Sequence, residues 1–273
     1  MEFINLLKTE VIFLLKRKEF LYVFTISLLF MLIAFFVDCF NLFQKDIMYI
    51  PPANQLWVGF DNQFGEAFYI FLLPLLPALA YADTHYLNNK TGAYKNILTR
   101  CRKSNYILAK GLVVFATGFA VIFAPLIVNQ LLYFIIAPLS SSKNILNWPA
   151  YMFIPTHNMV FRNLFLNSPY LYNVIYMILA SLVGSIAALM SYAISFVTNR
   201  SRLVIVAMPL VIYLIYNFVN ALLISGKYCL NYYLIGIGVP GLRAQYFFTV
   251  LLVIFIVSIT VIFFRNLHKD ELL

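Results

Sequence analysis

Long apolar runs alternate with short polar segments along the whole chain. A helix needs about 20 mainly apolar residues to cross the hydrocarbon core of a bilayer, and only a helix satisfies its own backbone hydrogen bonds there. Six runs approach or exceed this length: Phe20–Val37, Ala67–Ala82, Ile107–Ile136, Asn173–Thr198, Leu203–Ile224 and Tyr246–Phe264. The pattern predicts an all-α integral membrane protein with six transmembrane helices in a single transmembrane domain, residues 1–273.

A different periodicity precedes the first run. Apolar residues recur there every three to four positions, at Phe3, Leu7, Val11, Leu14 and Leu15, while Lys8, Glu10 and Lys16 to Lys18 stay polar. This spacing puts the apolar residues on one face of a helix. It predicts an amphipathic interfacial helix over residues 1–18, with its basic residues near lipid headgroups. The alternative is a cytoplasmic extension of the first span.

Two longer segments separate later spans. Residues 225–245 are largely apolar but are broken by Gly226, Pro240 and the charged Lys227. Such a segment is better suited to a re-entrant dip into the outer leaflet than to a full crossing. Residues 138–172 form the other outer segment. Trp57 and Trp148 fall in outer loops, where an aromatic belt is expected.

The composition indicates that the chain lies in a membrane, and the distribution of charge predicts its orientation there. The chain is 63% hydrophobic and 11% charged, with a mean hydropathy of +0.88, whereas charged residues make up about a quarter of a soluble domain. The net charge of +9 does not require a nucleic-acid partner, because 14 of the 19 Lys and Arg residues fall on one side of the predicted spans. By the positive-inside rule, both termini and residues 84–106 are cytoplasmic.

Catalytic signatures do not occur in the sequence. There is no phosphate-binding glycine loop, no paired carboxylate within a span and no metal-ligand spacing, so no catalytic or metal residue is predicted. Asp83 and His85 lie at a membrane edge and are interpreted as a solvated pair. Cys39 and Cys229 are both predicted outside, either as unpaired thiols or as a disulfide.

A few uncharged polar side chains lie within the predicted spans. The amides of Asn129, Gln130, Asn217 and Asn220 need partners in lipid. They bond other helices or line a transport pathway, and they are the candidate pathway-lining residues. A stripe of small residues, Ala180, Gly184 and Ala188, predicts close approach of another helix to the fourth span.

The loop between the second and third spans is basic and helix-compatible. Tyr94, Ile97 and Leu98 fall at i, i+3 and i+4, which predicts a short helix with an apolar ridge over Thr91–Thr99. A helix this short needs packing to be stable. It either docks into a groove on a cytoplasmic partner or is a loop that only obeys the positive-inside rule.

The stretch from Tyr81 to Gly111 resembles the region after the second span of ABC-2 type permeases. The likeness rests on Asp83, Thr91-Gly92, Ile97 to Arg100, Arg102-Lys103 and Tyr106 to Lys110, and extends to the six-span plan with both termini inside. The resemblance implies that residues 84–106 carry a coupling helix that binds a separate ATPase subunit. Its contact residues would be Thr91, Tyr94, Asn96, Ile97, Leu98, Thr99 and Arg100. Segment 138–172 is longer than that plan requires.

The sequence therefore predicts the permease subunit of an ABC transporter in a bacterial plasma membrane. It is expected to export an amphipathic peptide or lipid-like substrate, with a second permease subunit, either a copy or a homologue, completing the pathway within the membrane lipid. No cofactor is expected on this chain, because ATP and magnesium would be bound by the ATPase subunit. The alternative is a structural or assembly membrane protein without transport activity.

Overall fold

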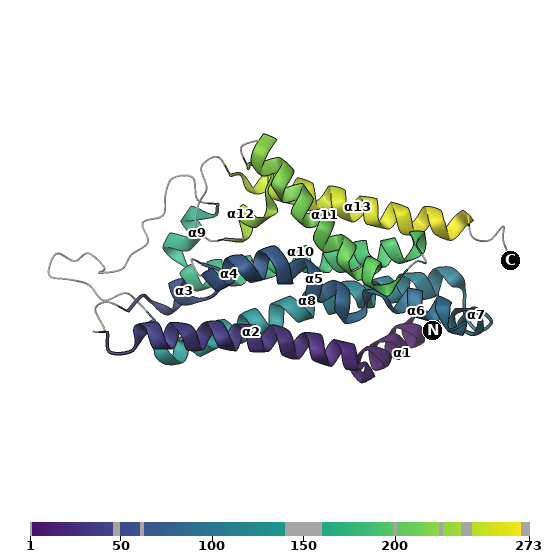
Figure 1. Ribbon diagram of the computed structural model, residues 1–273, viewed down its shortest axis with the longest axis horizontal. Helices are drawn as coiled ribbons and strands as arrows, with labels where there is room; N and C mark the ends of the chain where they lie inside the picture. Colours follow the sequence, from purple (N-terminus) through teal and green to yellow (C-terminus); the bar gives the residue numbers. More distant parts are fainter. Residues whose placement is uncertain are drawn as a thin grey trace.

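The protein is a bundle of long helices, described here from a computed structural model (Figure 1). The structure describes residues 2–45, 50–60, 63–139, 160–198, 201–223, 226–235 and 242–268. Within these residues the secondary structure is helical and contains no strand. Six helical segments are long and apolar enough to cross a membrane: Lys18–Leu42, Phe64–Lys90, Lys103–Ile136, Pro169–Val197, Arg202–Leu223 and Ala244–Phe264. The six predicted spans are thereby confirmed, and the chain is a multi-pass membrane protein.

Most of the long helices run along the bundle, α11 crosses it obliquely, and shorter helices gather at its two ends (Figure 1). The long helices are α2 (Lys18–Leu42), α8 (Lys103–Ile136), α10 (Pro169–Val197), α11 (Arg202–Leu223) and α13 (Ala244–His268). One end, called the inner end, holds α1 (Glu2–Lys16), α6 (Thr84–Lys90) and α7 (Ala93–Leu98). The outer end holds α3 (Ala53–Leu56), α9 (Arg162–Asn167) and α12 (Leu230–Leu234). Helix α1 begins and α13 ends at the inner end, whose cytoplasmic orientation stays a prediction.

Helix α10 forms the centre of the bundle. It is the most buried span and packs against α8, α11, α13 and the second span. A Cβ atom added at Gly118 of α8 would lie 3.0 Å from the Cα of Ser185 and 3.0 Å from the Cβ of Ala188, both on α10. Gly184 of α10 in turn faces Pro77 and Ile122. The close helix approach predicted from the small-residue stripe is therefore confirmed.

The second span is the irregular one. It consists of α4 (Gln63–Ala67), η2 (Phe68–Leu72), α5 (Leu73–Pro77), η3 (Ala78–Ala82) and α6, where η2 and η3 are single π-helical turns. Pro74 and Pro77 lie between the two turns. Proline removes a backbone donor and clashes with the preceding turn, so a wider turn on either side accommodates it. The regular α-helix is thus interrupted around these prolines, and the second π-helical turn ends directly before Asp83.

One segment at the outer end folds back against α11. Residues 226–235 return along α11, because the backbone amide of Leu230 donates to Asn217 Oδ1 (2.8 Å) and Asn231 hydrogen-bonds Tyr213. Tyr213 lies ten residues before the end of α11, or about 15 Å along a helix. That this segment re-enters the outer leaflet of a bilayer stays a prediction. Residues 236–241, and residues 140–159 of the other outer segment, lie outside the described residues.

Trp57 corrects one expectation. Its side chain is fully buried in the main core beside α3, so it is not part of an aromatic belt at the membrane surface. Trp148 lies outside the described residues. A Trp in an outer loop reaches lipid headgroups only if the loop stays at the surface, and here residues 50–60 pack into the bundle instead.

The cysteines at the outer end are unpaired thiols. Cys39 is half-buried, and Cys229 is buried and donates from Sγ to the backbone oxygen of Asn217 (3.2 Å). Burial raises the pKa of the Cys229 thiol, which keeps its proton available for this bond. Of the two alternatives left open by the sequence, the structure has the unpaired one.

Candidate functional site

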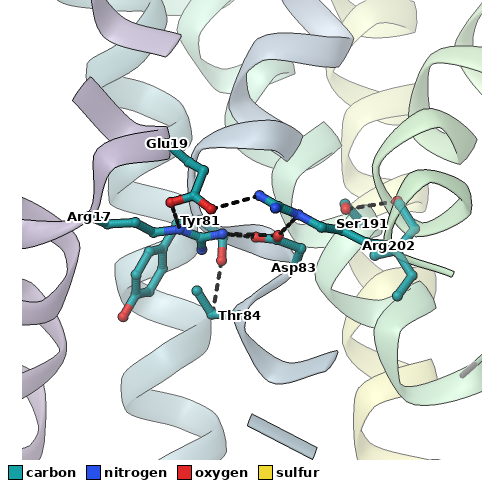
Figure 2. A network of polar contacts seen from close by, with 8 residues as sticks. Arg17, Glu19, Tyr81, Asp83, Thr84, Ser191 and Arg202 are labelled. Carbon is teal, nitrogen blue, oxygen red and sulfur yellow. Dashed lines mark hydrogen bonds and ion pairs between the residues drawn. The ribbon is translucent and has the colours of Figure 1, made fainter. Parts of the chain in front are cut away.

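Four charged residues form a closed ring at the inner end of the bundle (Figure 2). Arg17 Nη2 contacts Asp83 Oδ1 at 2.7 Å, and Arg17 Nε contacts Glu19 Oε2 at 3.2 Å. Arg202 Nε lies 2.5 Å from Asp83 Oδ2, and Arg202 Nη2 lies 3.1 Å from Glu19 Oε1. Each arginine thus contacts both carboxylates. We call these four residues the charge ring.

The charge ring joins three parts of the chain that are distant in sequence. Arg17 lies at the break between α1 and α2, where the backbone is extended, and Glu19 lies in the first turn of α2. Asp83 links the second π-helical turn to α6, and Arg202 is the first residue of α11. The ring therefore ties the first, second and fifth spans together at their inner ends.

The charge ring has a buried side and an exposed side. Asp83 is completely buried and the side chain of Arg17 is 10% exposed, whereas those of Glu19 and Arg202 are 39% and 38% exposed. A buried charge is costly unless it is paired and hydrogen-bonded. The ring meets this requirement because it is neutral overall and gives Asp83 two cationic partners.

A second polar cluster lies next to the charge ring. Tyr81 donates from its hydroxyl to Glu10 Oε2 (2.6 Å), and Lys110 Nζ lies 3.6 Å from the same oxygen. Lys110 also donates to the hydroxyl of Tyr106 (2.8 Å), and its side chain is only 1% exposed. The pair Glu10–Lys110 fastens α1 to α8. Like the ring, this cluster links helices through buried polar contacts.

Helix α7 lies at the tip of the inner end, where the chain passes from the second span to the third (Figure 1). Gly92 precedes it with φ of +74°, a conformation that glycine adopts without steric cost, and nothing lies within 4 Å of where its Cβ would be. The predicted short helix is confirmed, with bounds Ala93–Leu98. It begins two residues later and ends one residue earlier than the sequence predicts.

The predicted contact residues divide into two groups. Thr91, Asn96, Thr99 and Arg100 are exposed, and Tyr94, Ile97 and Leu98 are half-buried. Tyr94 packs on this chain itself, with its ring centroid 5.4 Å from that of His85 and 5.7 Å from that of Tyr106. Ile97 packs against the same inner core. The apolar ridge is thus turned partly toward the protein, and the freely exposed face of α7 is polar.

Two interpretations of polar residues at this end are wrong. Asp83 and His85 are not a solvated pair, because both are buried and Asp83 bonds Arg17 and Arg202; His85 stacks on Phe196 at 3.9 Å. Glu10 does not stay on an exposed polar face of α1, because it is buried against Tyr81 and Lys110. In each case the partner comes from a distant part of the sequence.

The four candidate pathway-lining amides are all buried at the outer half of the bundle. Asn129 accepts from the amide of Val58 (3.0 Å) and donates to the carbonyl of Met31 (3.3 Å). Gln130 donates to the carbonyl of Ala53 (3.0 Å) and accepts from Asn173. Asn217 bonds Tyr213 and the amide of Leu230, and Asn220 donates to Tyr216. The contacts of Asn129, Gln130 and Asn217 thus fasten outer segments, whereas Asn220 bonds within its own helix. A pathway-lining role stays a prediction.

Replacing Asn129 by Leu separates these two roles. The change leaves the buried amide of Val58 without an acceptor, so we expect the free energy of unfolding to fall by about 1–3 kcal/mol. Asn220→Leu is the control, because the Asn220 amide bonds within its own helix and its loss should cost less. Denaturant unfolding in detergent measures both. A stable Asn129→Leu protein would argue against the fastening role.

No protein-family model, curated protein or solved structure that was compared with this chain matches it. Within the part of the chain that the structure describes, no three His, Cys, Asp or Glu side chains gather as metal ligands. The charges of the site are paired with one another, so the arrangement is suited to holding helices together and to passing movement between them.

Proposed function

We propose that this chain is the membrane subunit of an ABC exporter, with α7 as the helix that couples it to a separate ATP-hydrolysing subunit. The observation that carries the proposal is the link between α7 and the charge ring. Helix α7 joins α6 through Thr91 and Gly92, and α6 begins directly after Asp83. A displacement of α7 would be passed by this short connection to Asp83 and from there to Arg17 and Arg202.

The proposal assigns a role to each polar cluster. The charge ring couples the inner ends of α2 and α11 to the second span, and the Glu10–Lys110 pair couples α1 to α8. Movement at α7 would therefore reach several spans at once, which is what opening a pathway requires. The irregular second span, with its two π-helical turns, supports the same role because such turns are frequent at functional sites.

The remaining parts of the transporter would come from partners. ATP and magnesium would be bound by the ATPase subunit, and a second permease subunit, a copy or a homologue, would enclose the pathway. The exported substrate would be an amphipathic peptide or a lipid-like molecule, and the membrane a bacterial plasma membrane. The second candidate is a structural or assembly protein, for which the tightly paired charges at the inner end would serve rigidity alone.

The test is co-purification with an ATPase subunit encoded beside this chain. We expect wild-type protein in nanodiscs to bind it and to stimulate ATP hydrolysis when an amphipathic peptide is added. The double variant Lys95→Glu/Arg100→Glu reverses two exposed charges at α7 and should weaken binding, chiefly through slower association. Lys90→Glu, an exposed residue at the end of α6, is the control and should bind more nearly like wild type.

Two outcomes would contradict the proposal. One is wild-type protein that binds no ATPase subunit, which would favour the structural role. The other is an α7 double variant that binds and stimulates hydrolysis as wild type does, because α7 would then not be the coupling element.

A further inference from the structure

An open groove runs between α1 and α7 on the inner end of the bundle. Its volume is about 480 Å³, and its apolar lining comes from Leu6 and Phe13 of α1 and Ile97 of α7. Arg100 and Cys101 lie on the α7 side, and Glu10 lies on the α1 side. Helix α1, which precedes the first span, and α7, which follows the second span, thus form the two walls of one groove. The apolar ridge of α7 does not by itself predict this groove, because the other wall comes from α1.

Helix α1 presents two different apolar faces. Ile4, Val11 and Leu15 are exposed along one side, whereas Leu6 and Phe13 face the groove. Leu6 is two residues from Ile4, and Phe13 is two residues from both Val11 and Leu15. At about 100° per residue, two positions correspond to about 200° around a helix. The two faces therefore point in nearly opposite directions.

Because the two apolar faces of α1 point in opposite directions, only one of them can lie against the membrane. Lys8 lies beside the face of Ile4, Val11 and Leu15 and is exposed, as in a helix that lies on anionic lipid. If that face lies against the membrane, the groove opens away from the lipid and toward the cytoplasm. Phe13 is 60% exposed there, and an exposed aromatic side chain beside a recess is a typical interface anchor.

The charge around the groove specifies the partner further. Residues 84–106, which include α7, contain no Asp or Glu, and Lys95 and Arg100 are exposed on and next to α7. Glu10 is buried and balanced by Lys110, so it adds no free negative charge to the groove. An occupant that complements this surface is apolar at its centre and acidic at its edge.

We propose that the groove between α1 and α7 binds an apolar segment with flanking acidic residues on the ATP-hydrolysing partner. Phe13, Leu6 and Ile97 receive the apolar side chains, and Arg100 pairs with an acidic one. This inference rests on the proposed function and adds that α1 is half of the docking surface. The N-terminal helix then has two partners, lipid on one face and the ATPase subunit on the other.

The experiment measures the affinity of the ATPase subunit for the full chain in nanodiscs. Phe13→Ala removes a groove anchor and should weaken binding by about 30-fold or more. Ile4→Ala is the matched control, because Ile4 is 59% exposed, nearly as much as Phe13, but lies on the opposite face. It should leave the affinity within about twofold.

Cys101 supplies a second readout that needs no substitution. It is half-buried and lines the groove, so maleimide should label it in the isolated chain, and the ATPase subunit should slow that labelling by about tenfold. Peptide mass spectrometry separates Cys101 from Cys39 and Cys229. Cys39 lies at the far end of α2, and its labelling should not respond to the ATPase subunit.

The outcomes separate this inference from the proposed function. If wild-type protein binds no ATPase subunit, both fail. A second outcome is that wild-type protein binds the ATPase subunit and the α7 double variant binds it more weakly, while Phe13→Ala keeps the wild-type affinity and the labelling rate of Cys101 does not change. The proposed function then stands, and the groove as a docking site is overturned. Protection of Cys101 by anionic vesicles, or by concentrating the chain, with no ATPase subunit present would identify lipid or a second copy as the occupant and would also overturn it.

Discussion

Replacing Asp83 by Asn is expected to lower the free energy of unfolding by about 3–5 kcal/mol. The side chain keeps its size but loses its charge, which leaves Arg17 and Arg202 without their shared carboxylate. Arg17 is nearly buried, so it would be a charge inside the protein with only the more exposed Glu19 to balance it. Denaturant unfolding of the purified protein in detergent, followed by circular dichroism, measures the loss.

Two further variants make this result specific to the charge ring. Arg202→Gln should cost less, because Arg202 is 38% exposed and Asp83 keeps both of its hydrogen bonds from Arg17 Nη2. The double variant Asp83→Asn/Arg17→Met should recover part of the loss, since it removes the buried cation together with its partner. Equal stability of Asp83→Asn and wild type would show that the ring does not hold the inner end together.

Gly118→Val should lower the free energy of unfolding by about 1–3 kcal/mol. The added Cβ would lie 3.0 Å from the backbone of α10 at Ser185, and two methyl groups would extend beyond it, so α8 and α10 would have to separate. Gly118→Ala should act in the same direction by a smaller amount. Both are measured by the same unfolding experiment.

Gly111 provides the control on the same helix. A Cβ at Gly111 would lie 3.6 Å from the ring of Tyr192, which is an ordinary contact, so Gly111→Ala should be neutral or slightly stabilising through its helix propensity. A loss for Gly111→Ala as large as that for Gly118→Ala would show that the close contact between α8 and α10 at Gly118 does not determine the result.

The sequence predicts the features of this fold that local patterns record. Six apolar runs locate the spans, the stripe at Gly184 indicates the close contact with α8, and the spacing of Tyr94 and Ile97 predicts α7. Each of these depends on neighbours within a few turns of one helix. The two prolines of the second span likewise indicate its interruption, although not that the interruption takes the form of two π-helical turns.

The charge ring could not be predicted in the same way. Arg17 and Asp83 are 66 residues apart, and Glu19 and Arg202 are 183 apart, so no local pattern pairs them. The positive-inside rule counts Arg17 and Arg202 only as basic residues on one side of the membrane. One signal was available: Glu10, Glu19 and Asp83 are acids beside or within apolar runs, where an unpaired carboxylate would be costly.

The residues of the charge ring are synthesised in a fixed order, and the last of them is Arg202. Ribosomes synthesise the chain from its N-terminus, so Arg17, Glu19 and Asp83 are made before the fifth span. Together these three residues carry a net charge of −1, and only Arg202 brings the group to neutrality. Insertion of the fifth span is thus the step that completes the charge ring, which carries one uncompensated negative charge until Arg202 arrives with that span.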